Sequence, residues 1–305
     1  MGKYDVIIIG GGPAGLTAGL YTSRAGLKSL LVERGMFGGQ IVNATLVENY
    51  PGFPEGISGY ELGSLMRQQA LKYGVEIATA EMTGITEEQP YEVSTTEGNF
   101  ESTTIIVAAG SEYHKLGVPG EERLSGHGVS YCATCDGFLF RGRDVAVVGG
   151  GDTAITDALE LSHHASRVYI IHRRDQLRAG RVLQQRAFAQ PKLEFIWNSV
   201  VQEALGEKML SELNLRNVKT GQQSTLEVAG AFVATGFMPN SQHFFNLLEL
   251  DDVGHIVTDE MMATSASGVF AAGDIRRNSA RQVASAVGDG VTAAMSAFKY
   301  IQKIN

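Results

Sequence analysis

The sequence predicts an α/β fold made of two similar halves, and three observations lead to that prediction. An apolar run typical of a buried strand is followed twice by a glycine-rich turn and a helix-like pattern, near residues 10 and 149. Further apolar runs end in Ala-x-Gly 100 residues after Gly10 (110 − 10) and 87 residues after Gly149 (236 − 149). Glycine makes up 37 of 305 residues, which favours tight turns and close backbone approach. We therefore predict two Rossmann-like dinucleotide-binding domains.

The first glycine-rich turn has the G-x-G-x-x-G spacing of a dinucleotide-binding fingerprint. Gly10 permits the tight turn, Gly12 lets the backbone approach a pyrophosphate, and Gly15 lets the following helix pack closely on the strand. Glu33 ends the next apolar run and would accept hydrogen bonds from an adenosine ribose. The expected elements of this copy are a strand over 5–9, a helix over 16–25 and a strand over 29–32.

The second turn has the spacing G-x-G-x-x-A, formed by Gly149, Gly151 and Ala154, with Asp152 and Thr153 between them. One fingerprint alone is weak evidence, because glycine-rich turns occur in other α/β proteins. Two fingerprints in the same strand–turn–helix–strand context are a strong signal. The expected elements are a strand over 145–148, a helix over 154–164 and a strand over 168–171.

The two copies differ where the ribose edge of a nucleotide should lie. Glu33 stands 23 residues after Gly10 (33 − 10), and the equivalent position after Gly149 is His172 (149 + 23). Three arginines follow it: Arg173, Arg174 and Arg178. A carboxylate repels a 2′-phosphate, whereas guanidinium groups bind it with paired hydrogen bonds. The second site should therefore prefer NADP to NAD, the alternative being a solvated basic patch.

Cys132 and Cys135 form a C-x-x-C pair, and Asp136 follows it directly. This spacing suits thiol–disulfide exchange, in which one thiolate attacks and the other resolves. Asp136 could supply a proton to the leaving thiolate, or it could simply cap the turn before Gly137. A zinc site needs four ligands and the chain has no other cysteine, so we expect no metal. Two inert buried cysteines are the remaining alternative.

Composition excludes several other classes of function. The formal charge is 25 − 33 = −8, which argues against binding nucleic acid or anionic lipid. No apolar run approaches the roughly 20 residues of a membrane span, and no signal-peptide pattern is present. Two cysteines in 305 residues do not make a secreted disulfide framework. We expect a cytoplasmic protein that is not attached to a membrane.

The fingerprint Gly10–Gly15 and two strand ends, Ala109-Gly110 and Gly273-Asp274, resemble the flavoprotein pyridine nucleotide-disulfide oxidoreductases. That resemblance implies that the first fingerprint binds FAD and that Asp274 reaches the ribityl–phosphate region. It also implies that the strand over 269–274 returns to the first domain, so that the second domain is an insertion. The expected division is an FAD-binding domain over 1–113 and 243–305 and an NADPH-binding domain over 114–242.

A closer resemblance is carried by the run SYCATCDGFLFR over 130–141, which is similar to that of bacterial-type, low-molecular-weight thioredoxin reductases. The segments FGGQ (37–40), VENYPG (47–52) and HRR (172–174) extend the likeness, which runs from about residue 5 to 295. In related families the cysteines lie near the start of the FAD domain, but residues 38–45 here contain none. Those relatives also carry a C-terminal dimerisation domain, for which the 31 residues after Asp274 (305 − 274) leave little room.

The resemblance extends the predicted FAD site beyond the glycines of the fingerprint. It places residues of the fingerprint helix, the Gly-Gly-Gln segment and the start of the last helix against the flavin nucleotide. The residues implied are Pro13, Ala14, Gly38, Gly39, Gln40, Asn49, Arg281, Gln282 and Val283.

The implied activity is transfer of electrons from NADPH through FAD and the Cys132–Cys135 disulfide to thioredoxin. The resemblance also implies that Cys135 faces the flavin and that Asp136 acts as the acid. It further implies that the protein is a homodimer. Rotation of one domain about segments 110–120 and 237–242 would let the disulfide and the nicotinamide reach the flavin in turn. One alternative is an enzyme of the same fold that uses NADH or ferredoxin, reduces another disulfide, or oxidises small dithiols. A more distant alternative is an FAD-binding sensor without catalysis.

Overall fold

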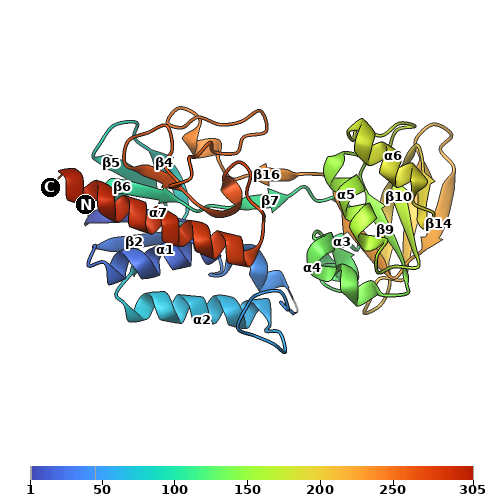
Figure 1. Cartoon of the computed structure of the whole chain (residues 1–305), viewed down its shortest axis with the longest axis horizontal. Helices are drawn as coiled ribbons and strands as arrows, with labels where there is room; N and C mark the ends of the chain where they lie inside the picture. Colours follow the sequence, from blue (N-terminus) through green and yellow to red (C-terminus); the bar gives the residue numbers. More distant parts are fainter. Residues whose placement is uncertain (1, 45, 305) are drawn as a thin grey trace. The chain divides into compact units, whose positions relative to one another are not determined.

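The computed structural model describes residues 2–44 and 46–304, and the chain divides into two compact units (Figure 1). Unit 1 comprises Met1–Glu112 and Met238–Asn305, and unit 2 comprises Tyr113–Phe237. The chain passes between them in β7 (Ser111–Tyr113) and β16 (Phe237–Pro239), which pair with each other. The predicted NADPH-binding domain spans 114–242. Unit 2 begins one residue earlier, at Tyr113, and ends five residues earlier, at Phe237. Met1, Thr45 and Asn305, which belong to the predicted FAD-binding domain, lie outside the described residues.

Unit 1 is built on a seven-stranded sheet in which β1, β2, β3, β6 and β17 run parallel, while β4, β5 and β6 form an antiparallel meander. Residues of β1 are buried on both faces of the sheet, as is usual for a parallel strand covered from two sides. The strands are β1 (Gly2–Ile9), β2 (Ser29–Glu33), β3 (Glu76–Thr79), β4 (Met82–Ile85), β5 (Tyr91–Thr95), β6 (Gly98–Val107) and β17 (Val269–Ala271).

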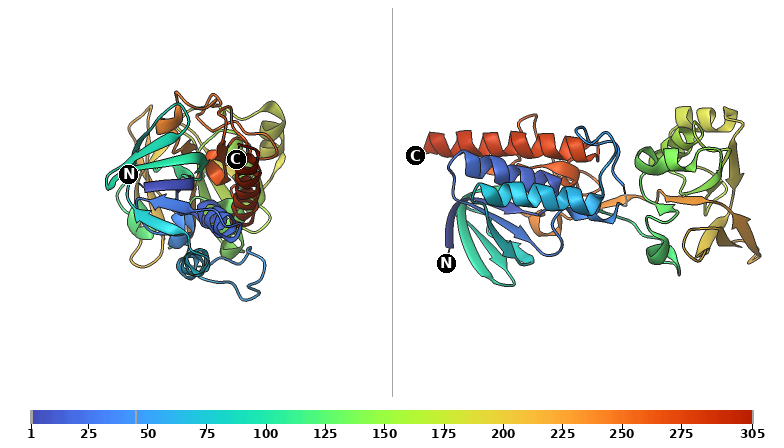
Figure 2. Two further views of the ribbon diagram at one scale, coloured as in Figure 1. Left: turned by 90° about the vertical axis from the view of Figure 1, so that its left-hand side faces the viewer. Right: turned by 90° about the horizontal axis from the view of Figure 1, so that it is seen from below.

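Three helices cover one face of this sheet (Figure 2). They are α1 (Pro13–Arg24), α2 (Gly59–Lys72) and α7 (Val283–Ile304). Alternate residues of β1, Val6 and Ile8, face these helices, and Ile7 and Ile9 face the opposite core. That second core is closed by residues of the 240–275 segment, among them Phe244 and Ile256.

Strand β17 has no fingerprint of its own and pairs with β6, so the strand ending in Gly-Asp lies in unit 1 as the resemblance implied. The insertion of one Rossmann-like unit into another, which the resemblance implied, is confirmed. The last helix, α7, runs to Ile304 and is rich in small apolar residues. Its close packing depends on small residues: a Cβ on Gly290 would overlap the carbonyl oxygen of Ala14 in α1.

Unit 2 holds a five-stranded parallel sheet of order β11-β10-β9-β15-β8 and a three-stranded antiparallel sheet of order β12-β13-β14. Its strands are β8 (Val129–Ser130), β9 (Asp144–Val148), β10 (Arg167–Ile171), β11 (Leu193–Ile196), β12 (Ser199–Leu205), β13 (Glu212–Asn217), β14 (Gln223–Glu227) and β15 (Gly230–Val233). Its helices are α3 (Glu121–Leu124), α4 (Ala133–Asp136), α5 (Asp152–Leu161) and α6 (Arg181–Ala189).

Short 3-10 helices occupy Gly39–Asn43, Gly137–Phe140, Gln242–Phe244 and Gly273–Ile275. Helix α5 begins two residues before the predicted helix over 154–164 and ends three before its predicted end, with Ser162 as its C-cap. Within the described part of the chain, no helix is both long enough and apolar enough to cross a membrane.

Candidate functional site

The turn between β1 and α1 has the geometry of a nucleotide cradle. Gly10 has φ +107°, and a Cβ there would overlap the carbonyl oxygen of Ala108. A Cβ on Gly15 would overlap the carbonyl oxygen of Gly10, so the third glycine allows the helix to approach. Gly12 caps α1 without a side-chain hydrogen bond, which leaves the helix N-terminus able to donate to a phosphate. This chemistry fits a dinucleotide such as FAD.

Glu33 lies beside this turn and braces it. Its Oε2 accepts a 2.6 Å hydrogen bond from the backbone N–H of Gly11, and its Oε1 accepts one of 2.7 Å from Gly35. Each carboxylate oxygen keeps a lone pair that can accept from a ribose hydroxyl. The bracing contacts were not part of the sequence prediction, which gave Glu33 only the ribose role.

The Gly-Gly-Gln segment packs against the same turn. Gly38 N–H donates to the carbonyl of Gly11 at 2.8 Å, and a Cβ on Gly39 would lie 3.2 Å from the Cα of Gly12. Gln40 reaches the carbonyl of Ser111 at 3.4 Å. Gly38 and Gly39, predicted from resemblance, thus lie at the fingerprint, whereas Gln40 reaches the start of β7.

Two other predicted FAD residues are joined by a side-chain hydrogen bond, in which Asn49 Nδ2 donates to Gln282 Oε1 at 3.1 Å. The carbonyl of Ala109 accepts from Asn240 Nδ2 at 2.9 Å, and that of Gly110 accepts from the backbone N–H of Asn240 at 3.0 Å. These bonds fix the end of β6, where the chain leaves the sheet.

Asp274 follows β17 and is partly buried. Its Oδ1 accepts a 3.0 Å hydrogen bond from Ser279 Oγ. Burial raises the pKa of Asp274 above its ordinary value, while the Ser279 bond and the charge of Arg281 oppose the rise. Gly273 has φ +79°, and a Cβ on it would lie 3.0 Å from Cβ of Ala14, so the Gly-Asp strand end lies beside the fingerprint helix.

Sequence reasoning missed Asp289, a buried carboxylate on α7. It accepts from the backbone N–H of Gly273 at 3.1 Å and pairs bidentately with Arg276, at 2.6 Å to Nε and 2.8 Å to Nη2. Asp289 thereby ties α7 to the strand end that carries Asp274. The signal available was a single acidic residue in a helix of small apolar residues.

The second fingerprint, between β9 and α5, repeats the first. A Cβ on Gly149 would lie 2.5 Å from the carbonyl oxygen of Ala234 and 2.7 Å from Cβ of Ala154. Gly151 faces open space and caps α5 without a side-chain bond. Asp152 accepts from the Gly180 N–H at 2.7 Å, and Thr153 is exposed.

The basic cluster is divided by the fold in a way the sequence did not predict. Arg173, Arg174 and Arg178 are exposed on the loop after β10, whereas His172 is buried at 5% exposure. Burial, and then the charges of these arginines, lowers the pKa of His172 against a backbone hydrogen bond with Gln176. The arginines alone form the exposed cationic surface.

Cys132 and Cys135 are joined by a disulfide, with their Cα atoms 5.3 Å apart, so the predicted pairing is confirmed. Cys132 is the N-cap of α4 and Cys135 lies within it. Thr134 Oγ1 lies 3.4 Å from Cys132 Sγ. Across residues 2–44 and 46–304, no cluster of three or more histidine, cysteine or acidic side chains could hold a metal ion.

Asp136 is linked to this disulfide through Ser130, a residue that the predicted site did not include. Ser130 Oγ donates to Asp136 Oδ2 at 2.6 Å and accepts from the Cys132 N–H at 3.1 Å. Burial raises the pKa of Asp136, and the Ser130 hydrogen bond partly opposes the rise. A carboxyl with a raised pKa next to a disulfide can hold a proton that a departing thiolate needs. Ser130 could have been found from its place two residues before the first cysteine.

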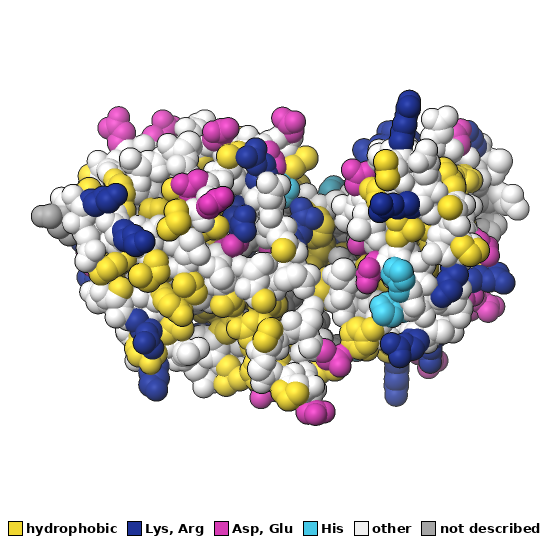
Figure 3. Space-filling view, in the orientation of Figure 1, with side chains coloured by type: hydrophobic (Ala, Val, Ile, Leu, Met, Phe, Trp, Pro, Cys, Tyr) yellow, Lys and Arg dark blue, Asp and Glu magenta, His cyan; other side chains and the backbone are white. Residues whose placement is uncertain are grey.

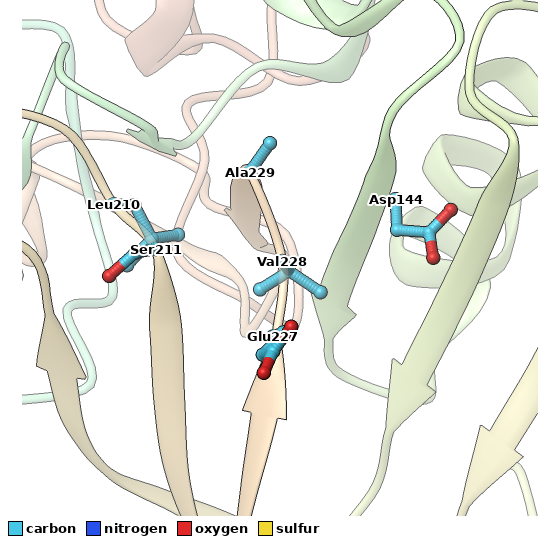
Figure 4. Close-up of a pocket in the computed structure, with 6 residues that line it drawn as sticks. All are labelled: Asp144, Leu210, Ser211, Glu227, Val228 and Ala229. Carbon is cyan, nitrogen blue, oxygen red and sulfur yellow. The ribbon is translucent and has the colours of Figure 1, made fainter.

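A shallow cavity of about 300 Å³ lies elsewhere in unit 2, lined by Asp144, Leu210, Ser211, Glu227, Val228 and Ala229 (Figure 4). Asp144 begins β9, so the cavity is at the amino end of this strand, opposite the fingerprint. Its two carboxylates would repel a phosphate. Dinucleotides bind at the carboxyl ends of parallel strands, and this cavity is therefore not a nucleotide site.

Two Rossmann-like units and a C-x-x-C disulfide with a neighbouring acid define an oxidoreductase that acts on a disulfide. The chain belongs to the pyridine nucleotide-disulphide oxidoreductase family, whose profile matches residues 4–290. It is 47% identical to the thioredoxin reductase of Listeria monocytogenes over 303 residues, which cover 99% of this chain and 95% of that protein. It is 46% identical to the thioredoxin reductase of Bacillus subtilis, covering 99% and 96%.

Solved structures give the same likeness. The thioredoxin reductase of Streptococcus pyogenes is 44% identical, with a TM-score of 0.95 and 99% of both chains covered. The Lactococcus lactis thioredoxin reductase, described as being in the FR conformation, is also 44% identical, with a TM-score of 0.67 over 98% of this chain and 99% of that one.

Proposed function

We propose that this protein is a thioredoxin reductase that uses FAD and NADPH. The observation that carries the proposal is the disulfide Cys132–Cys135 with Asp136 and Ser130 beside it, placed in the inserted nucleotide-binding unit. The high identity to thioredoxin reductases along nearly the whole chain supports it.

Bound FAD supplies a two-electron carrier between the nicotinamide and the disulfide. Gly10, Gly12 and Gly15 would hold its pyrophosphate at the N-terminus of α1, and Glu33 would accept from its ribose. Asp274, held on the strand end by Ser279, would orient the part of the cofactor between the phosphates and the ring.

The disulfide accepts two electrons and two protons and becomes two thiols. Asp136 gives one of these protons to the departing sulfur, and we assign to Cys135 the sulfur that faces the flavin. In the second half-reaction, a cysteine thiolate attacks the thioredoxin disulfide and forms a mixed disulfide. The other cysteine resolves it, which reforms the Cys132–Cys135 bond and releases dithiol thioredoxin.

The choice of NADPH rests on the exposed arginines 173, 174 and 178 after β10. Their guanidinium groups can bind a 2′-phosphate in paired geometry, which NADH does not carry. Gly149, Gly151 and Ala154 would hold the pyrophosphate at the N-terminus of α5, with Asp152 and Thr153 flanking it.

We propose that unit 2 rotates relative to unit 1 between the two half-reactions. The disulfide and the nicotinamide site both belong to unit 2, and the flavin cradle belongs to unit 1. The chain passes between the units only twice in its described part, in β7 and β16. Two thioredoxin reductases of equal identity to this chain differ in TM-score, 0.95 against 0.67, which supports movable units in the family.

We further propose that the protein is a homodimer in the cytoplasm, where thioredoxin is kept reduced. Hydrophobic side chains gather on the face of unit 1 that carries α1, α2 and α7 (Figure 3). On α2, Tyr60, Leu65 and Leu71 are 62%, 43% and 41% exposed, which suits a face covered by a second copy. Light scattering of the purified protein tests the dimer, and a monomer at all concentrations would contradict it.

The function is tested by anaerobic titration of the purified yellow protein with NADPH, with and without oxidised thioredoxin. We expect flavin bleaching by NADPH, its reversal by thioredoxin, and loss of turnover in Cys135→Ser with bleaching retained. A protein that binds no flavin, or that reduces thioredoxin equally well with Cys135→Ser, contradicts the proposal. Faster bleaching by NADH or reduced ferredoxin would favour the alternative electron donors.

A further inference from the structure

His172 lies between two parts of the second nucleotide site. Its ring is packed against the backbone of Gly150, the middle glycine of the second fingerprint. A Cβ on Gly150 would overlap the ring Nδ1 and would lie 2.5 Å from Cε1 and 2.7 Å from Cγ. The ring Nε2 is shielded from solvent and has no hydrogen-bond partner among the residues that the structure describes. The imidazole therefore fills a space that only a glycine at position 150 leaves open.

Gly150 also holds the arginine loop. Its carbonyl oxygen accepts the backbone N–H of Arg178 at 2.7 Å and that of Ala179 at 3.2 Å. Gly149 N–H donates to the carbonyl of Ile171, directly before His172, at 3.1 Å. The glycine turn and the arginine loop are thus joined by backbone hydrogen bonds, and the imidazole is packed against the same turn.

The charges around His172 oppose a role as a cation. Arg173, Arg174 and Arg178 surround it, and both its burial and their charges lower its pKa, against one backbone hydrogen bond with Gln176. Both effects favour the neutral imidazole, which adds no positive charge to the exposed arginines.

We infer that His172 is a positioning residue, which wedges the fingerprint turn against the arginine loop, and that it is not a ligand of the 2′-phosphate. This inference rests on the proposed function, because it concerns the site to which we assign NADPH. It separates one residue of the His-Arg-Arg run from the other two. The arginines select the 2′-phosphate, and the histidine sets the shape in which any nicotinamide dinucleotide binds.

The two roles have different consequences for selectivity. A wedge supports both the pyrophosphate turn and the arginine loop. His172→Ala should therefore lower the affinities for NADP⁺ and NAD⁺ by a similar factor, roughly three- to thirtyfold. The ratio of the two affinities stays unchanged. Arg174→Ala should lower the affinity for NADP⁺ alone, because NAD⁺ has no 2′-phosphate. His172→Leu, which keeps most of the volume without a polar atom, should bind both nucleotides nearly as the parent does.

A steric wedge also predicts compensation. Gly150→Ala alone places a methyl group against the ring and should lower the affinity for both nucleotides. Combining it with His172→Ala makes room for that methyl group, so the double variant should bind better than Gly150→Ala alone. A phosphate ligand gives no such rescue. His163→Ala, an exposed histidine of the same unit, is the matched control.

The measurement is isothermal titration calorimetry of the flavin-loaded oxidised protein with NADP⁺ and NAD⁺, after thermal melting has shown that each variant is folded. Equal losses for both nucleotides with rescue in the double variant support the inference. A loss confined to NADP⁺ in both His172→Ala and His172→Leu, or strictly additive effects at positions 150 and 172, overturns it. A parent protein that binds neither nucleotide contradicts the proposed function instead.

Discussion

At the scale of single residues, burial and hydrogen bonds decide which groups can do chemistry. The Ser130 hydroxyl donates a hydrogen bond to Asp136 and accepts one from the Cys132 N–H. One side chain therefore positions both the acid and the first cysteine. A hydrogen bond donated to a carboxylate favours the ionised form, whereas burial favours the protonated form. The two effects oppose each other at Asp136, and burial is the larger.

Ser130→Ala should therefore move the pH profile of disulfide reduction. A general acid works in its protonated form, so its contribution is present below its folded pKa and is lost as the pH rises through it. Removing the Ser130 bond raises the pKa of Asp136 further, which shifts that falling limb to higher pH. The measurement is the single-turnover rate of disulfide reduction against pH.

Ser130→Thr keeps a hydroxyl, so the rate should fall with rising pH at the same pH as in the parent protein. The exposed Ser166→Ala is the matched control. This account of Ser130 would be contradicted if the fall in rate moved to lower pH in Ser130→Ala. It would also be contradicted if the fall did not move in Ser130→Ala but disappeared in Asp136→Asn.

Glu33 offers a second test at this scale, in the protein freed of flavin. Glu33→Ala leaves the backbone N–H groups of Gly11 and Gly35 without their acceptor, which should reduce the free energy of unfolding by about 1–3 kcal/mol. Urea unfolding of the apoprotein measures it, with the exposed Glu55→Ala as control. If Glu33 served only the ribose, the variant would weaken FAD and leave apoprotein stability unchanged.

At the scale of elements, α7 is held to the sheet by small residues and by one buried ion pair. Arg276 and Asp289 have side chains that are 16% and 9% exposed, so the pair is largely shielded from water. Breaking a buried pair by removing one partner leaves an uncompensated charge. Asp289 also accepts the Gly273 N–H, so this charge lies at the base of the strand end that bears Asp274.

Arg276→Ala should destabilise unit 1 by about 3–5 kcal/mol and weaken its hold on FAD. The double variant Arg276→Met with Asp289→Leu removes both charges and should recover most of that stability. Urea unfolding with and without FAD measures both effects, and Arg277→Ala, an exposed neighbour, is the control. A single variant as stable as the parent would show that the pair contributes little.

The elements were also the part of the structure that sequence predicted best. A strand of apolar residues, glycines at fixed spacing and a following helix are local patterns, so the glycine turns at 10 and 149 were found without knowledge of the fold. The burial of His172 and the pairing of Asp289 with Arg276 depend on residues that come together only after folding. Ser130 has a telling place two residues before the first cysteine, but its hydrogen bond to Asp136 forms only after folding.

At the scale of the whole molecule, the predicted site residues belong to two different units. The residues predicted to bind FAD belong to unit 1, and the arginines, the second fingerprint and the disulfide belong to unit 2. Assigning both electron-transfer partners of the flavin to the same unit has a mechanical consequence. On the proposed function, one arrangement of the units would serve hydride transfer and another would serve disulfide reduction, so turnover would require motion of one unit against the other.

This requirement predicts that small-angle scattering of the flavin-loaded protein changes between the oxidised form and the form reduced with NADPH. Segments 110–120 and 237–242 are the expected hinges, because both contain glycine or proline and flank the two chain crossings. Gly117→Pro, which replaces a residue of φ +71° by one restricted to negative φ, should slow turnover severalfold without abolishing flavin binding. Exposed Gly142→Pro, with φ +69° and outside both segments, controls for local backbone damage. Identical scattering curves in both redox states, together with full turnover, would mean that a single arrangement carries out both half-reactions.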